Sequence, residues 1–291
     1  MPDSAVSLRD ATARPLGHDQ GRLELGFAVG PDGATRLSRQ FASYPFHLCR
    51  PFRLAADPPE MATLYVQSCS GGIYEGDRLS IRIETQPNAK LHVTTQAATI
   101  VRSMRGAGAR QETVLEARAG SLVEYLPDPL ILFPRARLET SVRVRADRDA
   151  RVLTGEAFLL HDPLGLGRPF AHVASSLQVE ERGSGRLLLR DRLAVRGEDW
   201  TARLPGVAED AAGTATLAIL SPDAQGLVTR LRSAIDAVTG LWGGASPLPR
   251  GTGAVCRFLA PDGRALRAGL DAVWRATRLH WTGTEPRARR K

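Results

Sequence analysis

The sequence of 291 residues contains very little lysine and no long apolar run. Lys90 and Lys291 are the lysines, and arginine supplies the rest of the 39 basic residues, which stand against 31 Asp and Glu. No stretch of about 18 uncharged apolar residues occurs, so a membrane-spanning helix is not expected. The first 20 residues lack the apolar core of a secretory signal. We therefore expect a cytoplasmic protein.

Cysteine is also scarce. Cys49, Cys69 and Cys256 stand far apart, and an odd number without paired spacing indicates neither a disulfide framework nor a zinc site. We expect these thiols to be mostly buried. The six histidines show neither i, i+4 nor His-X-His spacing, so no local chelating motif is present.

The chain is basic, with a formal charge of +8 and a pI of about 10.2. Its arginines are spread through alternating segments and do not gather in one arm or helix. An acidic protein partner fits this distribution as well as a nucleic acid does. A nucleic-acid-binding protein therefore stays open as an alternative.

Short segments with alternating apolar residues dominate the chain up to about residue 220. Residues 78–84 and 141–145 place apolar side chains at every second position, which is typical of a strand with one buried face. Residues 176–193 flank two glycines and are expected to form an antiparallel hairpin. The other predicted strands are 22–29, 45–54, 63–69, 91–98, 112–117, 121–126, 152–160, 199–203, 214–220 and 254–259.

The pattern then becomes helical. Ser221 and Pro222 are suited to begin a helix over residues 222–239, and a second apolar stripe predicts a helix over 263–278. The fold class is therefore mainly β with two C-terminal helices, with α+β as the variant.

One domain over residues 21–283 is expected. It would be flanked by a flexible tail at 1–20 and a basic flexible tail at 284–291.

Motifs of catalysis are missing. The glycine-rich loop at 69–77 leads into a strand and contains no lysine, so it does not resemble a phosphate-binding loop. No Gly-X-Ser-X-Gly or His-Glu-X-X-His pattern occurs. Glu156 lies in an apolar strand, so it either pairs with an arginine or lines a polar cavity, and pairing is the favoured reading. These features favour a non-catalytic scaffold; the enzyme alternative is a β-sandwich hydrolase that pairs Glu124 or Asp128 with Glu156.

Several segments in one order resemble the UreD (UreH) family of urease accessory proteins. The most specific are Thr-Thr-Gln-Ala-Ala-Thr at 94–99 and Glu-Tyr-Leu-Pro-Asp-Pro-Leu at 124–130. The others are Gly-Gly-Ile at 71–73, Gly-Asp-Arg-Leu at 76–79, Gly-Glu-Ala-Phe at 155–158, Asp-Arg-Leu at 191–193, Arg-Phe-Leu-Ala at 257–260, Trp-Arg at 274–275 and Pro-Arg at 286–287.

The resemblance implies stacked, largely antiparallel β-sheets with two C-terminal helices. It also implies a non-catalytic role in nickel insertion into urease, with UreF, the GTPase UreG and the urease apoprotein as partners. No cofactor would be permanently bound, and Ni²⁺ would pass through a polar tunnel lined by oxygen ligands too sparse to trap it. The C-terminal helices and the 124–134 segment are the expected partner surfaces. The residues nominated for the nickel path are Asp77, Thr94, Thr95, Glu124, Asp128, Glu156 and, less centrally, Glu60.

Overall fold

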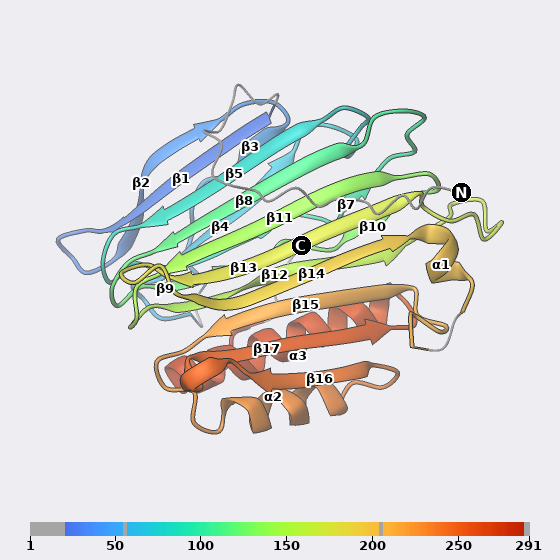
Figure 1. The fold of residues 1–291 in the computed structure, drawn as a ribbon. Helices are drawn as coiled ribbons and strands as arrows, with labels where there is room; N and C mark the ends of the chain where they lie inside the picture. Colours follow the sequence, from blue (N-terminus) through green and yellow to red (C-terminus); the bar gives the residue numbers. More distant parts are fainter. Residues whose placement is uncertain (1–20, 55–56, 204–205, 288–291) are drawn as a thin grey trace.

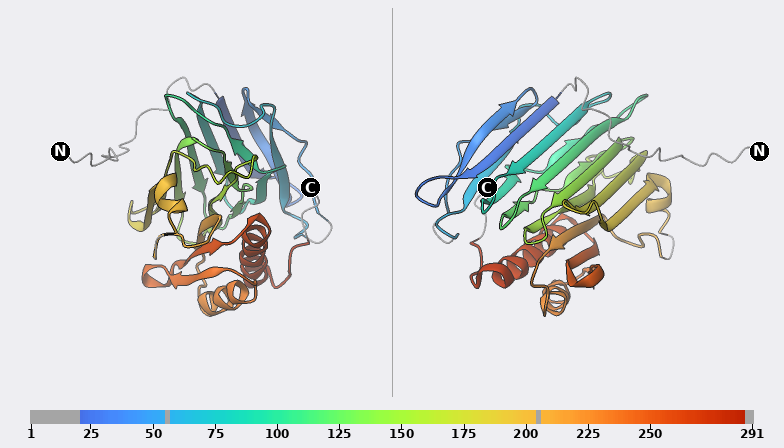
Figure 2. Two further views of the ribbon diagram at one scale, coloured as in Figure 1. Left: turned by 90° about the vertical axis from the view of Figure 1, so that its right-hand side faces the viewer. Right: turned by 60° about the vertical axis from the view of Figure 1, so that its left-hand side comes forward.

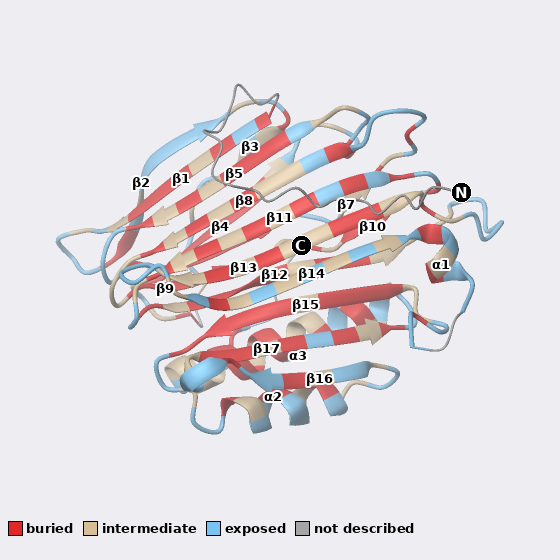
Figure 3. Ribbon diagram, in the orientation of Figure 1, coloured by how far each residue is buried: buried red, intermediate tan, exposed pale blue. Residues whose placement is uncertain are grey.

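The computed structural model describes residues 21–54, 57–203 and 206–287. Two β-sheets pack face to face, and helices α2 and α3 cover the outer face of one of them (Figures 1 and 2). The mainly-β class with helices near the C-terminus is thereby confirmed. Buried residues concentrate along the strands and on the inner sides of the helices (Figure 3).

The first sheet has seven strands in the order β14-β13-β11-β8-β5-β1-β2. Its inner face contributes apolar side chains to the core, and its outer face carries charged ones. Its strands are β1 (Gly21–Val29), β2 (Thr35–Ala42), β5 (Arg78–Thr85), β8 (Ala109–Ala117), β11 (Arg137–Ala146), β13 (His172–Glu181) and β14 (Leu187–Arg196).

The second sheet has ten strands, eight of them in the order β16-β17-β15-β12-β9-β6-β4-β3, with β10 pairing β12 and β7. It lies between the seven-stranded sheet and the helices. Its strands are β3 (Phe46–Leu48), β4 (Ala62–Ser68), β6 (Lys90–Thr95), β7 (Thr99–Val101), β9 (Leu122–Tyr125), β10 (Leu130–Leu132), β12 (Arg151–Leu160), β15 (Gly213–Leu220), β16 (Trp242–Pro247) and β17 (Gly253–Ala260).

The expectation of largely antiparallel pairing is wrong. In the middle of the seven-stranded sheet β1, β5, β8, β11 and β13 pair in parallel, and β4, β6, β9 and β12 do so in the other sheet. The chain alternates between the sheets from β4 to β13, so each strand returns to its own sheet in the direction of the previous one. Antiparallel pairs remain at β1–β2, at β3–β4, in the predicted β13–β14 hairpin, and from β12 through β15 and β17 to β16.

The helices differ from their predicted bounds. Helix α2 (Leu227–Asp236) follows Gly226 and not Ser221, because residues 221–226 form a turn stabilised by the hydrogen bond from Ser221 Oγ to the Asp223 carbonyl. Helix α3 (Gly263–Thr282) begins at the cap Asp262, whose carboxylate accepts from the Ala265 N–H at 2.8 Å.

Other elements also depart from expectation. The predicted strand at 199–203 is wrong, since it overlaps helix α1 (Gly197–Thr201), in which Trp200 is buried. Of the predicted strand 45–54, only β3 and a bridge at Phe52 are extended pairings. One short 3₁₀ turn, η1 (Pro249–Gly251), completes the elements.

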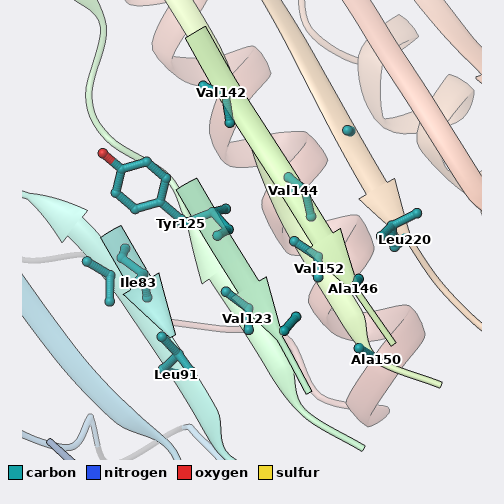
Figure 4. Packing of buried hydrophobic residues seen from close by; sticks show 14 of the residues in the cluster. Ile83, Leu91, Val123, Tyr125, Val142, Val144, Ala146, Ala150, Val152 and Leu220 are labelled. Atoms are coloured by element: carbon teal, nitrogen blue, oxygen red, sulfur yellow. The ribbon is translucent and has the colours of Figure 1, made fainter. Parts of the chain in front are cut away.

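Two apolar clusters lie between the sheets. One occupies the end near Leu91, Val123, Val144 and Val152 (Figure 4), and the other surrounds Phe158 at the opposite end. A third cluster joins the ten-stranded sheet to α2 and α3. Because the two inter-sheet clusters are separate, the interior between them is free for polar side chains.

The predicted tails fall largely outside the described residues, which omit 1–20 and 288–291. Pro286, within the predicted basic tail, is buried. The predicted partner surface at 124–134 is likewise buried or half-buried throughout. It closes the core and offers little surface for a partner.

Candidate functional site

A cavity of about 590 Å³ lies between the two sheets. Exposed residues of the 68–71 and 96–98 turns line it, so these two turns form its mouth. The 96–98 turn and Gly71 of the other turn belong to segments that carry the family resemblance. Tyr125, Val142 and Glu156 line its inner part.

A level of polar side chains crosses the inner face of the seven-stranded sheet beside this cavity, and Gln111 and Thr113 line the cavity itself. Gln111 of β8, Thr140 of β11 and Ser175 of β13 are register partners, with Thr113 two residues beyond Gln111. On β11, Thr140 lies between Leu138 of one apolar cluster and Val142 of the other. The polar level therefore follows the boundary between the two clusters.

Glu156 meets this level from the opposite sheet. The Ser175 hydroxyl donates to Glu156 Oε2 at 2.6 Å. Burial raises the pKa of the Glu156 carboxyl above its ordinary value, with the Ser175 hydrogen bond opposing the shift and Asp191 adding to it. Glu156 forms no ion pair with any described arginine, so the expected arginine pairing is wrong for this residue.

The polar level continues to the far side of the sandwich. Glu156 of β12 is the register partner of Thr216 of β15, which in turn faces Arg257 of β17. The Arg257 guanidinium pairs with Asp191 of β14. Arg257 is exposed, so the Arg257–Asp191 ion pair lies where this row of polar side chains meets solvent.

Thr95 and Asp128 lie near the mouth. The Thr95 hydroxyl oxygen accepts from the Asp128 backbone N–H at 2.8 Å, and both residues line the cavity. A narrow cleft of about 10 Å³, close to the space of one water molecule, also touches Asp128 and Glu156 on the helix side of the sheet. It leads towards Arg267 and Asp271 of α3.

Glu124 occupies a different environment. It is fully buried on the face of β9 that meets α3, where Arg278 Nε donates to Oε1 at 2.6 Å and Trp274 Nε1 donates to Oε2 at 2.8 Å. His92 Nδ1 lies 2.7 Å from Oε2, and Arg278 also donates to Asp57 at 2.8 Å. Burial raises the pKa of Glu124, but the charge and hydrogen bonds of Arg278 outweigh it and lower the pKa to about 2.

The nominated path residues thus separate into two groups. Thr95, Asp128 and Glu156 line the cavity. The remaining four do not: the Thr94 hydroxyl donates to the Leu126 carbonyl, Glu124 binds Arg278, Asp77 accepts from the Tyr74 N–H, and Glu60 pairs with Lys90. Glu124 and Glu156 lie on opposite faces of one sheet. They therefore cannot form the first of the two catalytic acid pairs that the hydrolase alternative allows.

Sequence reasoning missed Thr113, Thr140, Ser175 and Asp191. Thr140, Ser175 and Asp191 each interrupt the inward apolar face of a strand, as in Leu138-Thr140-Val142, and on β8 Thr113 does so together with Gln111. That interruption was visible in the sequence, but its alignment across four strands depends on the register.

The three cysteines differ in their exposure to solvent. Cys256 is buried, but Cys49 is half-buried and Cys69 is exposed at the cavity mouth, so the expectation of mostly buried thiols is wrong. Within the described ranges, no group of three His, Cys, Asp or Glu residues is arranged to hold a metal ion. None of the helices described here has the length and apolar character to cross a bilayer.

These features define a β-sandwich scaffold with an internal polar cavity and a helix-covered outer sheet. The profile of the "UreD urease accessory protein" family matches residues 19–291. Urease accessory protein UreD 1 of Pseudomonas syringae pv. tomato is 40% identical over 92% of this chain and 94% of its own length. Its counterpart in Methylorubrum extorquens is 41% identical over 97% of this chain and 95% of its own. The chain belongs to the UreD family of urease accessory proteins.

Proposed function

We propose that this protein is a non-catalytic scaffold in urease maturation and that Ni²⁺ crosses its inter-sheet cavity on the way to the urease apoprotein. UreF and the GTPase UreG would deliver the ion in a complex with this chain in the cytoplasm. The observation that carries the proposal is Glu156, a carboxylate in an interior cavity, bound by a hydroxyl and left without an arginine partner among the described residues.

The chemistry of the cavity suits a transient ion. Thr95, Asp128 and Glu156 offer oxygen ligands, which replace part of the lost hydration of a divalent cation. Thiolate or imidazole clusters would hold Ni²⁺ far more tightly. A carboxyl must lose its proton to bind a metal ion, and burial raises the pKa of Glu156, so protons compete with the ion more strongly here than at an exposed carboxylate.

Charge on the outer sheet face favours a scaffold over a nucleic-acid-binding protein. Arg82 and Arg145 both lie within 4 Å of Glu116, at 3.8 and 3.6 Å, and Arg145 also reaches Glu180 at 3.5 Å. These cross-strand ion pairs neutralise arginines that would otherwise be available to phosphates. Part of the positive charge of the chain is thus neutralised by carboxylates on the same surface.

The test is nickel loading of urease co-expressed with UreF, UreG and either the wild-type chain or Glu156→Gln/Asp128→Asn. We expect the variant to form the complex but to lower nickel per urease about tenfold at limiting nickel, the effect of about 1.4 kcal/mol on a rate. Asp77→Asn is the matched control, since Asp77 lies outside the cavity lining. Unchanged nickel content in the double variant would exclude this route.

A further inference from the structure

The loop between β12 and β13 presents two leucines to solvent. Residues 161–169 project from the end of the sandwich, at the right-hand edge of Figure 1. Leu164 is 66% exposed and Leu166 is 68% exposed. Gly165 and Gly167 have φ of +66° and +68°, a backbone conformation that glycine adopts readily and that turns both leucines outwards.

A single carboxylate holds this loop in shape. Asp162 accepts backbone N–H groups from Leu164 at 3.1 Å, Leu166 at 3.1 Å and Arg168 at 3.0 Å. The Arg168 guanidinium adds two hydrogen bonds, at 3.0 and 2.6 Å, and these hold the pKa of Asp162 well below its usual range. The leucines are therefore presented by an ordered loop, which reduces the entropy lost when a partner binds them.

The loop is continuous with the cavity mouth. The His161 and Phe133 rings lie 5.8 Å apart, and the Arg102 guanidinium lies 5.6 Å from the Phe133 ring. Arg102 also donates to the carbonyl of Gly71, a mouth residue, at 2.8 Å. A protein bound at the two leucines would thus sit beside the entrance to the cavity.

The surroundings of the loop are basic. Arg102 and the exposed Arg135 form no ion pair with a described residue, and the Asp162 charge is compensated by Arg168. The Arg135 N–H donates to the Pro169 carbonyl, which places that arginine at the base of the loop. A complementary surface would combine an apolar groove for the leucines with acidic side chains at its edge.

We propose that the 161–169 loop is the docking element for one of the proteins that exchange nickel with this chain. That partner offers an apolar groove with an acidic rim, and it covers the cavity mouth when bound. The inference rests on the proposed function, because the partner is defined as a protein that exchanges nickel with this chain.

The experiment measures the affinity of each purified partner for the full-length chain and for Leu164→Ser/Leu166→Ser. We expect affinity for one partner to fall at least about tenfold, as truncation of central apolar contacts does. The melting temperature should not change, because both leucines are exposed. Leu187→Ser, at an exposed leucine of β14, is the control and should bind normally.

A second variant tests the ordering of the loop. Asp162→Ala retains both leucines but removes the acceptor of five hydrogen bonds, so it should weaken the same partner by a smaller factor. Unchanged affinity for all three partners in the double-leucine variant overturns the proposal. So does an effect confined to self-association or to binding of anionic vesicles.

The outcome is separable from that of the nickel test. Glu156→Gln should bind every partner normally while lowering nickel transfer, and the double-leucine variant should fail at binding. If the Glu156 variant transfers nickel normally, the conduit is wrong, but a loss of affinity in the leucine variant still assigns the loop as a docking element.

Discussion

Glu124 and Glu156 lie on neighbouring strands of one sheet and have opposite environments. Glu124 faces α3, where Arg278, Trp274 and His92 surround its two oxygens. Glu156 faces the cavity and accepts a hydrogen bond from the Ser175 hydroxyl. The pKa of the first is lowered to about 2 and that of the second is raised. The face of the sheet, and not the residue type, decides which acid holds the fold and which is free for a ligand.

The largest effect is expected from breaking the Glu124 network. Arg278→Met leaves Glu124 and Asp57 buried without their cation, since the Arg278 side chain is 1% exposed. Loss of one partner of a buried ion pair costs about 3–5 kcal/mol. Chemical denaturation should show this loss. Arg264→Met, at an exposed position of the same helix, should stay within about 0.5 kcal/mol of the wild type; an equal loss in both variants would mean that the helix surface, not the ion pair, is responsible.

The same network predicts acid sensitivity. The folded-state pKa of Glu124 is lowered from 4.5 to about 2, so its contribution to stability is complete above pH 4.5 and is lost as the pH falls towards 2. That contribution is of the order of 3 kcal/mol. Unfolding free energies measured between pH 6 and pH 2.5 should decrease more steeply for the wild type than for Glu124→Gln. Parallel curves would show that other carboxylates control the acid transition.

A smaller loss is expected from Trp274→Phe. This substitution keeps most of the buried ring but removes the Nε1 donor to Glu124, at 2.8 Å. One hydrogen bond to a charged group contributes about 1.5–3 kcal/mol. Trp281→Phe is the comparison and should lose less, because Trp281 is half-buried and its Nε1 donates at 3.2 Å to an uncharged hydroxyl, that of Ser221. The reverse order would contradict a special role for the Glu124 site.

The sequence could predict the strands and the family, but it could not assign these two acids. Glu124 lies in a strand that is buried on both faces, so the alternation that identifies a solvent face is absent there. Its main partner, Arg278, follows 154 residues later. Parallel pairing was missed for a similar reason, because an alternating strand has the same pattern whichever neighbour it pairs with. The motif at 124–130 indicates the family, whereas the role of its acid depends on the contact with Arg278 in the folded chain.

The smallest effect on stability has the opposite sign and concerns Glu156. Its folded-state pKa is raised above 4.5, so the folded protein binds a proton more tightly than the unfolded chain, and stability is lost as the pH rises from 4.5 to the raised pKa. Glu156→Gln mimics the protonated form and keeps an acceptor for Ser175. At pH 7 it should therefore be as stable as the wild type or more stable, by up to about 1 kcal/mol.

The sign of the stability change in Glu156→Gln shows whether the carboxylate stabilises the fold or is available to bind a cation. The advantage of Glu156→Gln should disappear only below pH 4.5, where the carboxyl is protonated in the unfolded chain as well, and unfolding curves at pH 4 and pH 8 would measure this. The charge of Asp191, which pairs with Arg257, adds to the raised pKa of Glu156, so Asp191→Asn provides the control for its influence. A stability loss at pH 7 on replacing Glu156 would show that its carboxylate holds the fold as Glu124 does. A carboxylate that destabilises the protein containing it is instead what a site kept for a passing cation requires.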